Sequence, residues 1–420
     1  MTTPRSSAYR RSCTPTPQEG TPVDRIGLRV AYWRELNGLT QQLVADRVGR
    51  SRKWLSQIEN GHATLDHRRD LHALATVLRV SVTDLTGQAV ARPRSPEELA
   101  VHAMVPALRG ALDDEPETAG PINVDVLRAD VDRALAARMG CDYPALAALL
   151  PAVVTDARLL TGKDKPAGLE LFTRAAVCAA LAIKPWGQVD LASRLVERAD
   201  AAARTLDRRD LLAAVGFAAA QNALASGTSG GRRRSYALAV TAAEELGDSG
   251  TDDALTWYGA LHLHAAMSAA SLGHHDDIAV HLAEATTAAT RIGSDPWRME
   301  VTPANVGVWR VNIALEAGEP DRAAELANQV PRHELRTTQR LAHLHIGAGR
   351  GSYQSGNPAA AARHFLEADR VAPAELRSRP TVREIVGQMV RDGQGGENTR
   401  TLATRMHVDP LDPDAAPLAA

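Results

Sequence analysis

The stretch SRKWLSQIENG, residues 51–61, has the pattern of an amphipathic helix with one cationic side. Successive helical residues are rotated by about 100°, so one side of the stretch is polar and the other apolar. The polar side consists of Arg52, Lys53, Ser56, Gln57 and Asn60, and the apolar side of Trp54, Leu55 and Ile58. Arg, Lys and Gln side chains donate to base edges and to phosphate, and the major groove of B-DNA admits a helix. The same pattern also describes an ordinary solvated helix face, so the neighbouring sequence has to decide between the two.

The preceding stretch, LTQQLVADRVGR at residues 39–50, favours the DNA-binding interpretation. Thr40 can cap a helix over residues 41–48, and Gly49 can adopt the left-handed conformation that ends it. The inner face of this helix would consist of Val44, Ala45 and Val48. Ser51 then caps the next helix after a short turn. Two helices joined in this way, with a small residue where they cross, form a helix-turn-helix.

These residues resemble the Xre-type DNA-binding domains, the family of Cro and the phage repressors. The landmarks are Leu39-Thr40-Gln41, Ala45, Gly49, Ser51 and Ile58-Glu59-Asn60-Gly61. The resemblance covers residues 24–87 and implies five helices, at residues 24–37, 41–48, 52–60, 68–79 and 82–86. The sequence departs from the family pattern at Val44, where Leu is usual, and at Trp54, where a small polar residue is usual.

The resemblance also implies roles for single residues. The positions that read base edges are Arg52, Lys53 and Gln57. The positions that contact phosphate or support that contact are Gln41, Ser51, Ser56 and Asn60. Arg34 and Glu59 match a pair that ties the first helix to the third. Double-stranded DNA is therefore the partner that the N-terminal domain is expected to bind.

Charge is distributed unevenly along the chain. Residues 1–94 hold fifteen Lys and Arg against eight Asp and Glu, although the 420-residue chain has a net charge of −2. A basic N-terminal part suits contact with phosphate. Cys13, Cys141 and Cys178 are too far apart for a disulfide framework, and no stretch approaches the roughly 20 apolar residues of a membrane span. We therefore expect a cytoplasmic protein with no membrane segment.

Changes in composition divide the chain into segments. Ser, Thr and Pro dominate the N-terminus, an Arg- and Pro-rich stretch at residues 88–96 precedes a helical pattern at residues 97–112, and a stretch rich in acidic residues, Pro and Gly follows it at residues 113–121. These breaks predict a disordered arm at residues 1–23, a DNA-binding domain at 24–87, a linker with one helix at 88–121, a helical domain at 122–392 and a flexible tail at 393–420.

The second predicted domain is helical and repetitive. Five glycines recur at intervals of 44, 42, 45 and 38 residues, each followed five or six residues later by an alanine: Gly187, Gly231, Gly273, Gly318 and Gly356. A tight turn followed by a small residue is what stacked helical hairpins require. The clearest units, residues 271–285, 316–331 and 354–373, resemble tetratricopeptide repeats. The predicted fold is all-α, a five-helix helix-turn-helix domain followed by an α-solenoid of tetratricopeptide-like hairpins; a non-repeating Ala-rich bundle is the alternative.

The concave side of such a solenoid is lined by the first helix of each hairpin. Counting back from the turn glycines predicts an inner surface formed by Arg174, Gln221, Asn305, Asn312, His343, Arg350 and Tyr353. Asn305 and Asn312 would lie one above the other, and amide side chains can pair with a peptide backbone. The pattern predicts a groove for a peptide or small-molecule effector, although each of these residues also fits an ordinary polar surface.

No residue pattern predicts catalysis or a bound cofactor. Five histidines fall within residues 262–281, but pairs two residues apart point to different sides of a helix. No Cys or carboxylate frame completes a zinc set, no glycine-rich loop precedes a helix, and no nucleophile-base-acid set is visible. We therefore expect no metal, no cofactor and no enzymatic activity.

Together these features predict a transcription regulator. Helix-turn-helix domains commonly bind two half-sites as a two-fold dimer, so we expect a homodimer. The length of the repeat domain favours a role in sensing an effector. The alternative is a DNA-tethered scaffold whose repeats recruit a protein partner without a small ligand.

Overall fold

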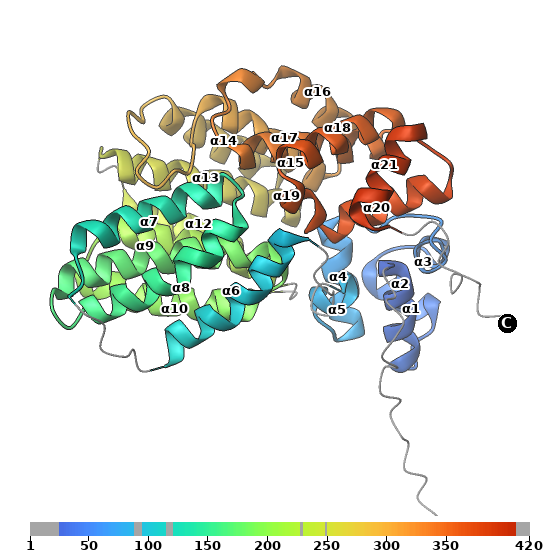
Figure 1. The fold of residues 1–420 in the computed structure, drawn as a ribbon. Helices are drawn as coiled ribbons and strands as arrows, with labels where there is room; N and C mark the ends of the chain where they lie inside the picture. The colour runs from blue at the N-terminus through green and yellow to red at the C-terminus, as the bar shows by residue number, and fades with distance from the viewer. Residues whose placement is uncertain (1–24, 88–94, 115–120, 227–229, 248–249, 409–420) are drawn as a thin grey trace, which may run out of the picture.

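The computed structural model describes residues 25–87, 95–114, 121–226, 230–247 and 250–408 (Figure 1). Within these ranges the regular structure consists of helices, with no strand. The predicted all-α fold, an N-terminal helical bundle followed by stacked hairpins, is confirmed. The predicted arm at residues 1–23 lies outside the described ranges.

The N-terminal bundle contains α1 (Ile26–Leu36), α2 (Gln41–Val48), α3 (Arg52–Glu59), α4 (Arg68–Leu78) and α5 (Val82–Thr86). Val44 and Leu55 are 0% exposed at the centre of its core. Gly27 allows α1 to lie directly on the end of α3, because a Cβ atom there would be 2.0 Å from the carbonyl oxygen of Ile58. The five helices lie within two residues of the bounds that the resemblance implied, although α1 and α4 have no side-chain cap.

Helix α6 (Pro96–Asp113) occupies the segment predicted to be a linker with one helix. Ser95 caps it by accepting a hydrogen bond from the Glu98 amide, at 3.2 Å. Its apolar side packs on α8, and Met104 and Leu108 are at most 1% exposed. This helix is therefore the first layer of the second domain's core rather than a free connector. The role of this helix was concealed because an Arg- and Pro-rich stretch precedes it and a stretch rich in acidic residues and Pro follows it, and both have the composition of a linker.

The second domain is a stack of helical hairpins. Its helices are α7 (Val124–Met139), α8 (Tyr143–Leu160), α9 (Lys165–Ile183), α10 (Val189–Leu206), α11 (Arg209–Ala225), α12 (Gly231–Leu246), α13 (Asp252–Leu272), α14 (His275–Ala289), α15 (Pro303–Ala317), α16 (Pro320–Gln329), α17 (Thr338–Gln354) and α18 (Pro358–Val371), with 3-10 turns η1 (Lys184–Trp186) and η2 (Arg332–Glu334). Gly273, Gly318 and Gly356 join the helices of three hairpins with φ of 79°, 83° and 77°. Glycine adopts this left-handed conformation at little cost, which explains why a glycine recurs at these turns. Gly231 is not a turn residue but the first residue of α12.

Alternate helices of this domain form an inner layer. Helices α7, α9, α11, α13, α15 and α17 each contact the next one in the series. Helix α17 also contacts α7, so the layer closes on itself, and we call it the inner ring. Tyr143 of α8 strengthens the closure by donating a 2.9 Å hydrogen bond to Glu375, although 232 residues separate the two in sequence. The two ends of the solenoid are thus in direct contact.

The chain continues in regular structure beyond the last hairpin, through α19 (Pro373–Arg377), α20 (Pro380–Arg391) and α21 (Gly396–Met406). The prediction of a flexible tail from residue 393 is wrong for residues 393–408, because α21 packs on α18 and α20 (Figure 1). Leu402 and Met406, one helical turn apart, are at most 1% exposed. The polar stretch before them hid this short apolar stripe. Residues 409–420 lie outside the described ranges.

Two helices are more apolar than the sequence analysis expected. Helix α8 and the segment Lys165–Trp186 are long and apolar enough to cross a membrane by length and composition alone. In the second of these, 67% of the apolar window is buried within the protein, where α9 contacts α7, α10 and α11. Helix α8 packs on α6, α7 and α9. In α8, 39% of the window is buried, so burial in the core accounts for the composition of the second segment more fully than for that of α8.

Four of the histidines form two pairs, one inside each of two hairpins. The Nδ1 atoms of His262 and His281 are 2.9 Å apart, and those of His345 and His364 are 3.3 Å apart. Burial lowers the pKa of His262 and of His345 to about 4, so both rings are neutral near pH 7. Among the described residues, no group of three or more His, Cys, Asp and Glu is arranged to hold a metal ion.

Candidate nucleic-acid interface and interior polar cluster

Helix α3 presents its cationic side to solvent in the folded chain. Arg52, Lys53 and Gln57 are exposed. Leu55 and Ile58, on the opposite side, are 0% and 2% exposed. The repeat domain therefore leaves the three predicted base-reading side chains uncovered. Two cations and an amide on one open helix face can meet phosphate and base edges together.

The turn before α3 is held by side-chain caps. The hydroxyl of Thr40 accepts a hydrogen bond from the Leu43 amide at 3.2 Å, and that of Ser51 accepts one from the Trp54 amide at 3.1 Å. Gly49 ends α2 with a φ of 74°. These groups satisfy amides that the first turn of a helix leaves unpaired, and so they fix the direction in which α3 leaves the turn.

A buried carboxylate ties the polar side of the bundle together. The Nε and Nη2 atoms of Arg34 donate to Glu59 at 2.7 and 3.0 Å, as the resemblance implied. The side-chain amide of Gln41 also donates to Glu59, at 2.8 Å. Asn60, the last residue of the polar side, donates to the Ser56 hydroxyl at 3.1 Å. Gln41, which was predicted to contact phosphate, is thus bonded to Glu59 within the bundle, at the start of α2.

The bulky residue at position 54 packs beneath an arginine that the sequence analysis did not consider. The guanidinium carbon of Arg50 lies 5.6 Å from the centre of the Trp54 ring. Arg50 also forms an ion pair of 2.8 Å with Asp70 of α4. Trp54 itself packs against the bundle core. The departure from the family pattern thus supports an additional tie between α3 and α4.

The loop between α3 and α4 fastens the bundle to the inner ring. Asp66 is 5% exposed, and Arg350 of α17 donates to its carboxylate at 2.9 Å and to its carbonyl oxygen at 3.1 Å. The side-chain amide of Gln354 donates to the same carboxylate. Arg350 was predicted to line an effector groove. Its guanidinium instead holds the N-terminal bundle.

Further contacts join the same two parts of the chain. The backbone amide of Ile26 donates to Glu384 of α20 at 3.3 Å. Arg68, the first residue of α4, lies 3.9 Å from Glu316 of α15, and α4 also contacts α13. Tyr353, another predicted groove residue, interacts with Thr64. The start of α4 therefore lies against the inner ring.

Two predicted groove residues have partners within the repeat domain. Arg174 forms an ion pair of 3.1 Å with Asp132, and its guanidinium carbon lies 5.0 Å from the centre of the Trp297 ring. Gln221 accepts a hydrogen bond from the ammonium group of Lys184. Arg174 contributes to packing between α9 and its neighbours, whereas Gln221 belongs to a polar cluster within the ring.

The two predicted groove asparagines do not form an exposed amide stack. Asn305 is 1% exposed and donates to the carbonyl oxygen of Glu300 at 2.7 Å. Asn312 donates to the carbonyl oxygen of Val308, one turn earlier in its own helix, at 2.9 Å. Counting from the turn glycine gave the correct helix but not the rotation of each side chain. We therefore correct the assignment of Asn305, which supports the loop before α15.

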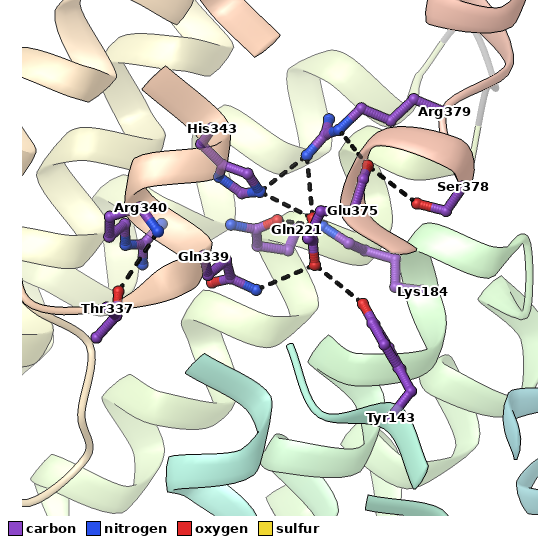
Figure 2. Close-up of polar contacts among 10 residues, drawn as sticks. All are labelled: Tyr143, Lys184, Gln221, Thr337, Gln339, Arg340, His343, Glu375, Ser378 and Arg379. Atoms are coloured by element: carbon purple, nitrogen blue, oxygen red, sulfur yellow. Dashed lines mark hydrogen bonds and ion pairs between the residues drawn. The ribbon is translucent and has the colours of Figure 1, made fainter. Parts of the chain in front are cut away.

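A polar cluster lies where the two ends of the inner ring meet (Figure 2). We call it the interior polar cluster, and it consists of Tyr143, Lys184, Gln221, Gln339, Arg340, His343, Glu375 and Arg379. Glu375 is 1% exposed and accepts hydrogen bonds from Tyr143 at 2.9 Å and Gln339 at 3.4 Å. Its other oxygen lies 3.0 Å from His343 and 3.4 Å from Arg379. One carboxylate thus receives groups from three separate helical segments.

The surroundings shift the pKa values of this cluster. Burial, followed by the charges of Arg68 and Arg379, lowers the pKa of Lys184 to about 7. Burial and the nearby charge of Arg138 lower the pKa of Arg340 to about 10. Burial alone would raise the pKa of Glu375, but the hydrogen bond from His343 and the positive charges around it hold that pKa well below its usual range. The cluster therefore stabilises the ionised form of Glu375 and destabilises the charged forms of Lys184 and Arg340.

Comparison with known families identifies the N-terminal part. A family model described as a helix-turn-helix domain matches residues 25–88. This segment is a helix-turn-helix domain. The match ends before α6 and covers none of the repeat domain.

Three solved structures are similar to the chain over most of its length. PlcR of Bacillus thuringiensis, in complex with the peptide PapR7 and DNA, is 11% identical with a TM-score of 0.31, over 83% of this chain and 99% of PlcR. Apo ComR from S. thermophilus is 15% identical with a TM-score of 0.32, over 79% and 98% of the two chains. Apo ComR, the competence regulator from Streptococcus vestibularis, is 13% identical with a TM-score of 0.33, over 89% and 99%. No curated protein matches the sequence.

Residues at the contact between the two domains and in the interior polar cluster were missed by the sequence analysis. Asp66 lies in a polar loop, and 284 residues separate it from Arg350. Lys184, Glu375 and Arg379 lie in or beside short turns, outside the helical pattern that was used to select inner residues. The rarity of lysine, with four among 48 basic residues, was the one signal that could have pointed to Lys184.

Proposed function

We propose that this chain is a sequence-specific, DNA-binding transcription regulator whose repeat domain senses an effector. The observation that carries the proposal is the uncovered cationic side of α3, with Arg52, Lys53 and Gln57 exposed on a helix-turn-helix domain. A helix of this kind fits the major groove, where Arg and Lys pair with guanine and Gln with adenine. We assign the chain no catalytic activity and place it in the cytoplasm.

The contacts between the two domains support the sensing part of the proposal. Arg350 of α17 and Glu384 of α20 bond to the helix-turn-helix domain; α17 closes the inner ring by contacting α7, and α20 contacts α17. A ligand that changes this closure would change the position of the helix-turn-helix domain. Because such domains bind paired half-sites about 34 Å apart, a homodimer would convert that movement into a change in operator affinity.

Selection of bound duplexes from a random DNA pool tests the proposal. We expect an inverted repeat whose half-sites are centred about 10 base pairs apart, or a multiple of that distance, as for a two-fold dimer. A single conserved half-site would contradict the homodimer, and failure to retain any duplex at low salt would contradict DNA binding.

Titration of short peptides and organic acids against operator affinity tests the sensing role. An effector should change the affinity at least about fivefold, which corresponds to a coupling free energy of about 1 kcal/mol. A compound that binds the repeat domain tightly yet leaves operator affinity unchanged would argue for the scaffold alternative.

A further inference from the structure

The interior polar cluster contains more positive than negative charge. Arg340 of the cluster is 6% exposed, and Arg138 of α7, outside the cluster but close enough for its charge to act on Arg340, is 7% exposed. Both bond to Met299, Arg138 to the sulfur and Arg340 to the carbonyl oxygen. Lys184 bonds to the neutral amide of Gln221. None of these partners carries a negative charge. Charged groups withdrawn from water are normally paired with an opposite charge. Among the described residues the nearest carboxylates, Glu300 and Glu375, act on Arg340 and Lys184 without an ion pair, so the two buried arginines and the half-buried lysine have no direct counter-charge.

Hydrogen bonding in the same place is also incomplete. The Nε atoms of Arg138 and Arg340 are buried and have no hydrogen-bond partner among the described residues. The Nε2 atom of His343 lies 3.0 Å from a Glu375 oxygen and 2.8 Å from Nη2 of Arg379. One ring nitrogen can donate to the carboxylate or accept from the guanidinium, but cannot do both. Buried polar groups left unpaired cost free energy, and a ligand can satisfy them.

We propose that the interior polar cluster is a binding site for the carboxylate of the effector, and that Glu375 occupies part of it in the ligand-free protein. This inference rests on the proposed sensing role of the repeat domain, since it names the chemistry that the domain recognises.

Glu375 indicates what chemistry the site accepts. Its carboxylate already receives the Tyr143 hydroxyl, the Gln339 amide and the Arg379 guanidinium, a donor set that fits a planar, singly charged group with two oxygens. Lys184 bonds to the neutral amide of Gln221 and forms no ion pair among the described residues, whereas Arg340 lies beyond Gln339 and His343 (Figure 2). A ligand carboxylate can take the place of Glu375, and a ligand larger than that side chain can also engage Lys184, an interaction that Glu375 does not make.

Displacement of Glu375 would reach the helix-turn-helix domain by a short route. Glu375 joins α19 to Tyr143 of α8, and α19 leads directly into α20, whose Glu384 bonds to the Ile26 amide. Arg68, at the start of α4, contributes to the positive potential at Lys184. A carboxylate bound at this site would therefore weaken the contact that closes the inner ring. It would also attract the positive charge of Arg68 at the start of α4.

Binding of simple carboxylates to the full chain, without DNA, tests the site. Citrate is compared with chloride at equal ionic strength, and the rise in unfolding temperature and the calorimetric Kd are measured. We expect citrate to stabilise the wild-type protein. Glu375→Gln removes the competing negative charge but keeps its shape, so it should tighten citrate binding by about tenfold or more. Glu334→Gln, on the exposed surface, is the matched control and should leave the Kd unchanged.

A second variant keeps the test decisive if Glu375→Gln fails to fold. Lys184→Met removes a cation that has no negatively charged partner, so it should unfold at the same or a higher temperature without citrate and lose most of the citrate response. Lys163→Met, at an exposed position, should keep that response. Equal citrate binding by wild type and Lys184→Met, or no binding by wild type, would overturn the proposal.

Two further probes distinguish the sources of the carboxylate. Tri-alanine with a free C-terminus represents a peptide, and its C-terminal amide lacks the negative charge. Binding of the acid but not the amide assigns the site to a peptide C-terminus, whereas binding of citrate alone assigns it to a small organic acid. Equal binding of acid and amide would contradict a carboxylate site. None of these measurements involves DNA, so a protein that binds duplexes but no carboxylate loses this inference and keeps its DNA-binding role.

The pH dependence of citrate binding gives an independent signature. Lys184 faces Gln221 of α11, His264 of α13, Arg68 of α4, Arg138 of α7, and Glu375 and Arg379 at α19. The lowered pKa of Lys184, about 7, means that the free protein loses this proton as pH rises above 7, whereas a bound anion favours the protonated form. Binding is then coupled to proton uptake, and affinity should fall between pH 7 and 8.5 by up to about tenfold per pH unit. Lys184→Met should bind equally weakly at both pH values; a pH-independent Kd in the wild type would contradict the role of Lys184.

Discussion

Replacing Arg350 by glutamine is expected to release the helix-turn-helix domain from the inner ring. The substitution leaves the Asp66 carboxylate, 3% exposed, with only the neutral amide of Gln354 as a side-chain partner at this contact. Removing one member of a buried ion pair costs about 3–5 kcal/mol because the remaining charge loses its counter-charge. The domain can avoid most of that cost by moving away and allowing water to reach Asp66. We therefore expect faster hydrogen exchange at the start of α4 and a separate, earlier unfolding transition for the helix-turn-helix domain.

Two comparisons make this result specific. Arg370 is 70% exposed and pairs with Glu367 on the surface, so Arg370→Gln should change stability by less than about 1 kcal/mol and leave a single transition. Asp66→Asn removes the buried charge itself, so adding Arg350→Gln to it should cost less than Arg350→Gln does alone. Fully additive effects of the two substitutions, or unchanged exchange at α4, would show that this ion pair does not hold the domains together.

Replacing Arg52 by alanine is expected to weaken binding to the selected operator by about 5- to 150-fold, the equivalent of roughly 1–3 kcal/mol. Arg52 is exposed at the start of α3, and no ion pair engages its side chain within the described part of the chain. Loss of a bidentate contact should also relax the preference for one base pair. A second selection from the random pool, carried out with the variant, would reveal that position.

The contrast with two other variants decides whether Arg52 reads bases. Gln41→Ala should weaken binding to all duplexes by a similar factor and leave the preferred sequence unchanged, because phosphate contacts carry no sequence information. Arg322→Ala, at a site 67% exposed on the repeat domain, should bind DNA like the wild type. If Arg52→Ala and Gln41→Ala reduce affinity without any change in the selected sequence, Arg52 is a phosphate contact and not a base reader.

Helices α2 and α3 follow from the sequence alone, because their determinants are local, whereas the other three helices of the domain were implied by the family resemblance. Thr40 and Ser51 cap the amides of their own helices, and Gly49 with a φ of 74° ends α2 where the chain must turn. The 100° rotation per residue separates Leu55 and Ile58 from Arg52 and Gln57 without reference to any distant residue. The turn glycines Gly273, Gly318 and Gly356 can be read from the sequence for the same reason, whereas Gly231, which begins α12, could not.

Only the tertiary structure decided which side chains meet across the chain. Asp66 pairs with Arg350 across 284 residues, and Tyr143 with Glu375 across 232, because the inner ring closes and brings α17 and α19 back to the start of the solenoid. Ring closure depends on the small rotation between each hairpin and the next, summed over the whole stack. The total rotation over the stack cannot be read from any local sequence pattern. The sequence could therefore place Arg350 and His343 on inward-facing helices but could not assign their partners.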